Sequence, residues 1–308
     1  MKKALIIIFL LFAGFLAFYA IKESSLINSA ATMIDIKNQK NNKPIICRQT
    51  KGEIKTSLKA PENQAQSVLL LNFDTEKVIY EKNSSQKLPS ASLTKLMTST
   101  ISLQENKPDT LLQVSNEATV SGEAAMGLKE EEYCSVKELI YGMILNSGNE
   151  AAETAAQKDR QDFIDKMNQK AKDLCMNSTH FINPTGLDED SNQINTTSAT
   201  DLTRLIYFIK DTSPIIMDAL TTWEYHANGK GHQSLFLYNT AWKFTNDYPY
   251  LIGGKTGNTD KAGYNFIGLS EKKEKKLLLI ILKEPTYNDI RKDTRSLFDY
   301  GFEVLENI

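Results

Sequence analysis

Strand-forming segments lie near both ends of this chain of 308 residues, and helix-forming segments fill the sequence between them. Residues 67–71 and 77–80 flank the turn-forming residues 72–76, which is the pattern of a hairpin. A second hairpin pattern, residues 264–269 and 277–282 around a charged turn, follows close to the end. Apolar strands bury their faces by sharing a sheet and by packing against other elements. The sequence therefore predicts an α+β fold, in which one antiparallel sheet is assembled from distant segments and flanked by helices.

The helices are identified by apolar residues that recur at helical spacing. Ser135 and Glu138 form a capping box, which predicts the start of one helix. That helix should end at residues 146–149, and an alanine-rich helix should resume at Glu150. Further helices are predicted over residues 92–101, 163–174 and 290–305.

An uncharged apolar run, residues 4–21, follows a pair of lysines at the start of the chain. Its length is about the minimum for a membrane-spanning helix, and the lysines favour a cytoplasmic start. A cut after Ala20 would place Phe18 where a signal peptide needs a small residue. We therefore expect residues 1–21 to be an uncleaved membrane anchor, with a cleaved signal peptide and a secreted product as the alternative. Either one places the rest of the chain outside the cytoplasm.

The composition indicates a folded domain behind a polar segment. Hydrophobic residues make up 41% and charged residues 24%, which is typical of a globular protein. The net charge is only −2, so nothing indicates a nucleic-acid partner. Residues 22–60 are polar and show no sustained period, so we expect a linker there and the folded domain over residues 61–308.

The cysteines and histidines match no known zinc-binding spacing. If the domain is exported, one pair of its three cysteines can form a disulfide, and the sequence leaves open which pair. The histidines form no His-Glu-x-x-His arrangement, which disfavours a zinc hydrolase. The residues concerned are Cys47, Cys134, Cys175, His180, His226 and His232.

A serine and a lysine stand three residues apart in Ser92-Leu93-Thr94-Lys95. On a helix this spacing places both side chains on one face, close enough to interact. A serine hydroxyl becomes a good nucleophile only when a base removes its proton, and a lysine can act as that base if its pKa is lowered. Such a pair arises by chance in a chain of this size, so alone it is also consistent with an ordinary capped helix.

Two further short motifs follow in the chain. In Ser147-Gly148-Asn149 the serine can pass protons and the Asn149 amide can hold a substrate amide. In Lys255-Thr256-Gly257 the lysine and threonine can bind a carboxylate, and the glycine lets a substrate lie against the strand edge. Taken alone, each of the two motifs is more typical of an ordinary turn.

In this order the three motifs resemble the signature of serine penicillin-binding proteins and class A β-lactamases. The form Ser-Gly-Asn resembles the low-molecular-mass penicillin-binding proteins that are D-alanyl-D-alanine carboxypeptidases. The resemblance extends from about Lys59 to Phe302 and implies a transpeptidase fold of the β-lactamase-like type. It also covers the stretches Leu88-Pro89-Ser90-Ala91-Ser92-Leu93-Thr94-Lys95, Phe181-Ile182-Asn183-Pro184-Thr185-Gly186-Leu187 and Gly254-Lys255-Thr256-Gly257-Asn258-Thr259-Asp260.

The resemblance implies a role for each motif residue. Ser92 would attack the carbonyl between two terminal D-alanines, Lys95 would be the general base, and Ser147 would relay a proton to the leaving amine. The implied partners are peptidoglycan stem peptides, with β-lactams as inhibitors and no metal or cofactor. Lys95 should have a depressed pKa, because burial and the positive charge of Lys255 both lower it. The implied substrate-binding residues are Asn149, Lys255, Thr256, Gly257 and Asn258, with the backbone N–H groups of Ser92 and Asn258 as the oxyanion hole.

The chain departs from the family pattern in one place that concerns binding. Many members carry an Asn-Arg-Asn segment before the Lys-Thr-Gly strand, and here the matching segment is Asn239-Thr240-Ala241. An arginine contribution to carboxylate binding is therefore in doubt. Many members also append a β-rich domain and a C-terminal anchor, so here the N-terminal segment is expected to do any anchoring.

The motifs also bear on three other functions. A class A β-lactamase needs a Glu-x-x-x-Asn loop, and residues 177–190 contain no such pattern. A D,D-endopeptidase would use the same site on cross-linked peptides. An inactive cell-wall-binding protein would not need the full set of motif side chains, all of which are present.

Overall fold

The structure is a computed structural model that describes residues 47–308, apart from 190–192 and 246–247. The predicted anchor, residues 1–21, lies outside the described residues. Within them, no helix combines the length and the apolar composition that crossing a membrane requires.

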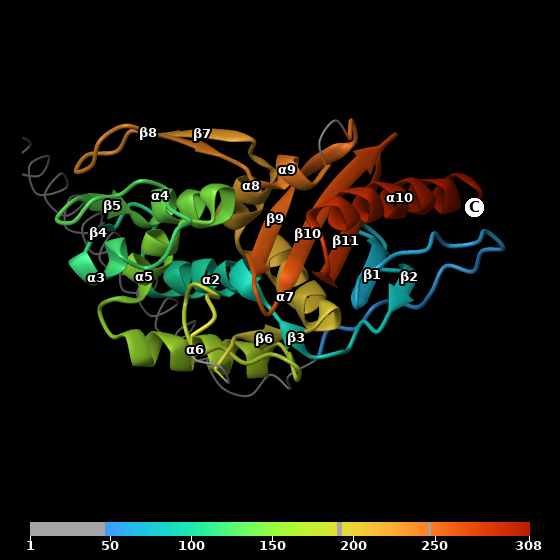
Figure 1. The fold of residues 1–308 in the computed structure, drawn as a ribbon, viewed down its shortest axis with the longest axis horizontal. Coiled ribbons are helices and arrows are strands. Elements are labelled where there is room, and N and C mark those ends of the chain that lie inside the picture. Colours follow the sequence, from blue (N-terminus) through green and yellow to red (C-terminus); the bar gives the residue numbers. More distant parts are fainter. Residues whose placement is uncertain (1–46, 190–192, 246–247) are drawn as a thin grey trace, which may run out of the picture. The chain divides into compact units, whose positions relative to one another are not determined.

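A central antiparallel sheet is made of strands from the two ends of the described chain. Its strands are β1 (Ser67–Asn72), β2 (Val78–Lys82), β9 (Leu251–Thr259), β10 (Gly263–Lys272) and β11 (Lys275–Glu284). They lie in the order β2-β1-β11-β10-β9, so the two hairpins join through β1 and β11, with Leu69 opposite Ile280 (Figure 1). The predicted sheet of distant segments is confirmed, and β9 lies at its edge.

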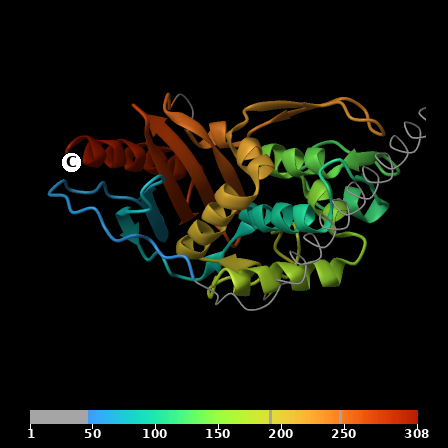
Figure 2. The same cartoon turned by 180° about the vertical axis from the view of Figure 1, so that it is seen from behind.

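Both faces of the sheet are buried, because successive residues of its strands are apolar on either side. Leu279 belongs to the buried cluster covered by the C-terminal helix α10 (Tyr287–Glu306). Its neighbour Ile280 belongs to the cluster on the opposite face, where helix α7 (Ala199–Thr212) packs. Figure 1 shows α10 across one face, and Figure 2, from behind, shows α7 across the other.

A mainly helical region extends from one side of the sheet (Figure 1). Its helices are a 3₁₀ turn η1 (Ala91–Thr94), α2 (Lys95–Glu105), α3 (Asn116–Thr119), α4 (Val136–Tyr141), a π-helical turn η2 (Gly142–Asn146), α5 (Asn149–Ala156), α6 (Arg160–Asp173) and α8 (Pro214–Thr221). Helix α9 (Ala241–Thr245) packs instead against β9 and α10. Short strand pairs complete the fold: β3 (Leu88–Pro89) with β6 (Thr196–Thr197), β4 (Leu111–Gln113) with β5 (Tyr133–Ser135), and β7 (Glu224–Ala227) with β8 (Leu235–Tyr238).

The helices expected from the sequence are present. The capping box is confirmed, since the Ser135 hydroxyl accepts a hydrogen bond from the backbone N–H of Glu138 at 3.2 Å. The sequence analysis did not predict α7, α8 or the β7–β8 hairpin. In the second strand of that hairpin Phe236 and Tyr238 are exposed, and they alternate with buried residues. The strand is only four residues long, so its alternating pattern is too short to identify it from the sequence.

Residues of the predicted linker bond to the domain where the structure describes them. The backbone N–H of Lys51 donates to the carbonyl of Glu76 at 3.0 Å, and that of Ile54 donates to Val78 at 2.8 Å. Cys47 forms a disulfide with Cys175. The segment from residue 47 to 54 is therefore held against the edge of the sheet.

A buried carboxyl group lies at the end of β11, beneath α10. Glu284 is fully buried, and Asp293 of α10 lies beside it. Burial, and then the neighbouring carboxylate of Asp293, raises the pKa of Glu284 from its ordinary value of 4.5 to about 8. The side chain therefore holds a proton at pH 7 in the folded protein but not in the unfolded chain.

This difference in proton binding predicts a pH-dependent stability. Between pH 4.5 and 8 the folded state binds more protons than the unfolded state, so the free energy of unfolding should fall as the pH rises. The fall amounts to at most about 1.4 kcal/mol per pH unit. Urea melts should show this slope in the wild type and a flatter one in Glu284→Gln. The exposed Glu303→Gln on α10 is the control, and an unchanged slope in Glu284→Gln would contradict the assignment.

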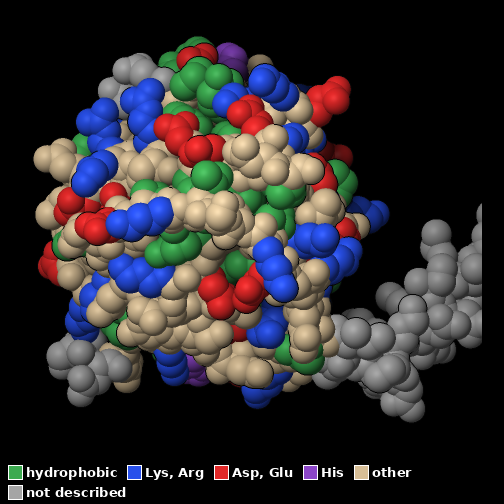
Figure 3. All heavy atoms as spheres, turned by 90° about the vertical axis from the view of Figure 1, so that its right-hand side faces the viewer, with side chains coloured by type: hydrophobic (Ala, Val, Ile, Leu, Met, Phe, Trp, Pro, Cys, Tyr) green, Lys and Arg blue, Asp and Glu red, His purple; other side chains and the backbone are tan. Residues whose placement is uncertain are grey.

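Charged side chains are mixed on the face shown in Figure 3, where basic and acidic groups alternate without a large area of one sign. This agrees with the small net charge of −2. That face therefore offers no extended basic surface of the kind that binds a phosphate backbone.

Candidate active site

The serine of the first motif lies in a tight turn at the start of a buried helix. Ser92 is in η1, and α2 begins only at Lys95, so the predicted helix starts as a 3₁₀ turn. Ala91 before it has a left-handed backbone, with φ of 46°. Gly186 packs on this turn so closely that a Cβ there would lie 1.9 Å from the Ala91 carbonyl oxygen. Only glycine fits this contact, which holds the backbone next to Ser92 in place.

The Lys95 amine lies within hydrogen-bond distance of three oxygen atoms. Its Nζ is 2.9 Å from Ser92 Oγ, 2.8 Å from Asn149 Oδ1 and 2.7 Å from the backbone oxygen of Thr185. The last two are acceptors only, so they take two N–H groups of a neutral amine and leave its lone pair for the serine hydroxyl. The arrangement suits removal of the Ser92 proton.

The pKa of Lys95 is lowered, as the sequence analysis predicted. The side chain is fully buried, and burial lowers its pKa to about 7 against the opposing carboxylates of Glu150 and Glu153. The repulsion between the two lysines acts on the other partner: burial and then the charge of Lys95 lower the pKa of Lys255 well below its usual range. A substantial fraction of Lys95 is therefore uncharged near neutral pH.

Ser147 and Lys255 form a second hydroxyl–amine pair in the same site. Ser147 follows η2 with a left-handed φ of 61°. Its Oγ accepts a hydrogen bond from the Nζ of Lys255 at 2.9 Å, and the same amine donates to the carbonyl of Thr256 at 2.8 Å. The two hydroxyl groups of the site are thus each backed by a buried lysine.

The edge strand β9 passes close to the nucleophile. A Cβ on Gly257 would lie 3.2 Å from the backbone nitrogen of Ser92, so the glycine allows this close approach. The hydroxyl of Thr256 lies 2.7 Å from that of Thr240. Thr240 is the central residue of the segment that departs from the family pattern, so a hydroxyl stands where many members have an arginine.

A cleft of about 920 Å³ opens over these groups. Among the predicted residues Ser92, Ser147 and the run 256–258 line it, whereas the buried Lys95, Asn149 and Lys255 lie behind its surface. Three partly exposed aromatic residues also line the cleft: Trp223, Tyr238 and Trp242.

The sequence analysis missed some residues that hold the site. The carbonyl of Thr185 binds Lys95, although only the stretch around it was noted, as part of the resemblance. Glu150 is buried and its Oε1 accepts hydrogen bonds from the backbone N–H groups of Met126 and Gly127 at 2.6 and 2.8 Å. These contacts involve backbone groups of loops that are distant in the sequence. No residue pattern predicts them, because they depend on how those loops are folded.

The family model described as D-alanyl-D-alanine carboxypeptidase matches residues 54–286. Among curated proteins, the D-alanyl-D-alanine carboxypeptidase DacF of Bacillus subtilis is 29% identical over 253 residues, which are 79% of this chain and 64% of that protein. The D-alanyl-D-alanine endopeptidase of Haemophilus influenzae is 32% identical over 213 residues, 67% of this chain and 70% of that protein. The chain thus spans less than two thirds of the length of DacF.

The structure also resembles a solved structure of a protein with the same description as the family model. The D-alanyl-D-alanine carboxypeptidase of Mycobacterium tuberculosis superposes with a TM-score of 0.71 at 26% identity, covering 82% of this chain and 96% of that one. The predicted fold class, an antiparallel sheet flanked by helices in the penicillin-binding-protein arrangement, is confirmed.

Proposed function

The chain belongs to the D-alanyl-D-alanine carboxypeptidase family, and from this membership we propose that it hydrolyses the terminal D-alanine from peptidoglycan stem pentapeptides through an acyl-enzyme on Ser92. The observation that carries the proposal is the buried Lys95 amine, 2.9 Å from Ser92 Oγ. A hydroxyl with a neutral amine at this distance is an activated nucleophile.

In the proposed reaction Lys95 accepts the Ser92 proton as the serine oxygen attacks the carbonyl carbon of the scissile peptide bond. The oxyanion is stabilised by the backbone N–H groups of Ser92, in η1, and of Asn258, on the edge strand β9. The C–N bond then breaks, and Ser147 relays the proton held by Lys95 to the departing D-alanine amine, which leaves Lys95 neutral again. In the second half Lys95 takes a proton from the water that attacks the ester, and this proton passes to Ser92 Oγ as the shortened peptide leaves.

The carboxylate of the terminal D-alanine is proposed to bind at the hydroxyl groups of Thr256 and Thr240. Both line the cleft and lie 2.7 Å apart. Lys255 is behind them and bonded to Ser147, so it contributes through that serine and through its charge when protonated. The side-chain oxygen of Asn149 accepts a hydrogen bond from Lys95, so we propose that Asn149 orients the base.

Mass spectrometry of the protein after exposure to penicillin tests this proposal. We expect one stable penicilloyl adduct on the peptide that contains Ser92, because the described region between residues 177 and 189 contains no glutamate–asparagine loop to activate a deacylating water. Ser92→Ala should lose the adduct completely, whereas Ser90→Ala, two residues away, should keep it. A wild type that forms no adduct, or that turns penicillin over rapidly, would contradict the proposal.

The endopeptidase function is a second candidate, because one of the relatives carries that name. Incubating the protein with a monomeric pentapeptide and with a cross-linked dimer separates the two. Release of D-alanine from the monomer at the higher rate supports the carboxypeptidase, and faster cleavage of the dimer supports the endopeptidase.

The location of the enzyme follows from its substrate. The family acts on the cell wall outside the cytoplasm, and the disulfide between Cys47 and Cys175 agrees with an oxidising compartment. We propose that residues 1–21 anchor the chain in the cell membrane with the catalytic domain outside. Fractionation should recover the full chain with the membranes, and a cleaved, soluble product would support the signal-peptide alternative.

A further inference from the structure

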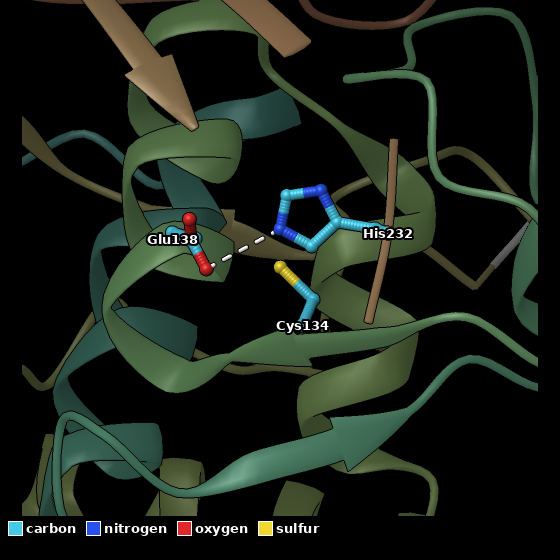
Figure 4. A group of neighbouring side chains, drawn as sticks. All are labelled: Cys134, Glu138 and His232. Atoms are coloured by element: carbon cyan, nitrogen blue, oxygen red, sulfur yellow. Dashed lines mark hydrogen bonds and ion pairs between the residues drawn. The ribbon is translucent and has the colours of Figure 1, made fainter. Parts of the chain in front are cut away.

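A cysteine, a glutamate and a histidine meet outside the cleft, beneath the tip of the β7–β8 hairpin (Figure 4). Cys134 comes from β5, Glu138 from the first turn of α4, and His232 from the loop between β7 and β8. Their side chains are 0%, 8% and 0% exposed, respectively. The sulfur, a carboxylate oxygen and a ring nitrogen lie within 4.8 Å of one another. Three side chains of metal-binding types are therefore enclosed together.

The hydrogen bonds of His232 show which ring nitrogen faces the cluster. Its Nδ1 lies 2.6 Å from the backbone oxygen of Gln233. A carbonyl oxygen can only accept, so Nδ1 carries the proton in the neutral ring. The lone pair of Nε2 then points at the Glu138 carboxylate, 3.4 Å away. Two acceptors in this position repel each other unless a positive charge lies between them.

Either a second proton on His232 or a metal cation can supply that charge. The second nitrogen of a metal-bound histidine typically donates to a backbone carbonyl or a carboxylate, as Nδ1 does here. The Glu138 carboxylate is itself fixed, by the Ser135 hydroxyl at 2.7 Å and the backbone N–H of Gly229 at 2.9 Å. Either a proton or a metal would satisfy the histidine and the glutamate, and a metal would in addition take up the Cys134 sulfur, which lies within 4.8 Å of both ligand atoms.

The distances suit a small, tetrahedral cation. Zinc binds nitrogen and oxygen at about 2.0–2.2 Å and sulfur at about 2.3 Å, which places its ligand atoms about 3.3–3.8 Å apart. The nitrogen–oxygen separation of 3.4 Å already fits. The widest separation, at most 4.8 Å, needs to shorten by about 1 Å, which side-chain rotation allows. A thiolate with an imidazole selects zinc over magnesium or calcium.

We propose that Cys134, Glu138 and His232 bind one Zn²⁺ ion, with water as the fourth ligand. On binding, the S–H bond of Cys134 breaks, its sulfur bonds to the metal, and the proton leaves to the solvent. The thiolate and the carboxylate together balance the charge of the ion. The sequence analysis expected no metal, because Cys134 and Glu138 lie almost a hundred residues from His232 and form no contiguous motif.

The ion would fix the β7–β8 hairpin to the helical region. The tip already bonds there: the backbone N–H of Tyr133 donates to the Gly231 carbonyl at 2.8 Å, and that of Gln233 donates to Glu132 Oε1 at 3.2 Å. The opposite end of the hairpin, at Glu224 and Tyr238, lines the cleft. Zinc at the tip would therefore hold one wall of the cleft in place.

Metal titration of the full chain tests the site. After removal of metals with a chelator and without added reductant, Zn²⁺ should bind with a stoichiometry of one and raise the thermal midpoint, since a ligand of the folded state stabilises it. Co²⁺ in place of Zn²⁺ should give a thiolate-to-metal charge-transfer band. Two of the three cysteines form the disulfide, so such a band reports Cys134 alone.

Variants locate the ligands. Cys134→Ser should lose the Co²⁺ band, and His232→Ala should lose stoichiometric binding of Zn²⁺. His226→Ala is the matched control, because His226 lies exposed on the same hairpin and bonds to Ser234 instead; it should bind as the wild type does. A wild type without the charge-transfer band, or a band that persists in Cys134→Ser, would overturn the proposal.

Discussion

Lys95→Met is expected to slow acylation by penicillin about 100- to 10,000-fold, the range that a general base contributes. Methionine fills the space of the lysine stem but cannot accept the Ser92 proton. The amine it replaces is buried and lies 2.9 Å from Ser92 Oγ. Stopped-flow or quenched mass-spectrometric measurement of adduct formation gives the rate directly.

The pH dependence of the same rate distinguishes a base from a structural lysine. The pKa of Lys95 is about 7, because the side chain is buried. Below that pH the amine is protonated and cannot act, so the acylation rate should rise as the pH increases through about 7 and then level off. A lysine with an ordinary pKa would give a rise only near pH 10.4.

Two variants serve as controls for Lys95→Met. Lys95→Arg keeps a positive charge but cannot lose it, so it should be as slow as the methionine variant at every pH. Lys107→Met, at an exposed lysine after α2, should acylate as the wild type does. A Lys95→Arg protein that retained the rise near pH 7 would show that another group titrates, and Lys95 would lose its assignment as base.

The parts of the site that the sequence predicted are those carried by short contiguous motifs. Ser92 and Lys95 are three residues apart, and their meeting depends only on one turn of helix. Both lie where that spacing places them. The pairing of the hairpins was also predictable, because two apolar hairpins with few other partners for their faces join into one sheet.

Contacts between distant loops could not be predicted in this way. The hydrogen bond from Lys95 to the Asn149 side-chain oxygen was not among the sequence predictions. Nor was the one from the Lys255 amine to Ser147, and the predicted roles of Asn149 and Lys255 in substrate binding stay predictions. A motif indicates which residue types lie near a reaction, but it does not indicate which of two nearby acceptors an amine binds. That choice depends on how the fold positions segments that are about a hundred residues apart in the sequence.

The sequence likewise did not predict which cysteines pair, and the disulfide that forms is expected to contribute strongly to stability. The sequence left three possible pairs, and the structure joins Cys47 to Cys175 while Cys134 stays buried as a thiol. The bridge connects the segment before the first strand to the end of α6, across a sequence separation of 128 residues. Because the loop that it closes is long, the covalent bond restricts the unfolded chain strongly.

Opening this disulfide is expected to lower the free energy of unfolding by about 4–5 kcal/mol, the loop-closure entropy of a ring of this size. That is about a quarter or more of the total stability of a typical domain, and it should lower the thermal midpoint by roughly 10 °C. The measurement is a pair of melts, with and without a phosphine reductant.

A double variant, Cys47→Ser with Cys175→Ser, should melt at the reduced midpoint under both conditions, which separates the disulfide from other effects of the reductant. If the reductant shifted the double variant as much as the wild type, or if the oxidised wild type were no more stable than the double variant, the bridge would not be the source of the stability. Cys134 is a thiol in the wild type and in the double variant alike, so the difference between their melts reports the Cys47–Cys175 bond.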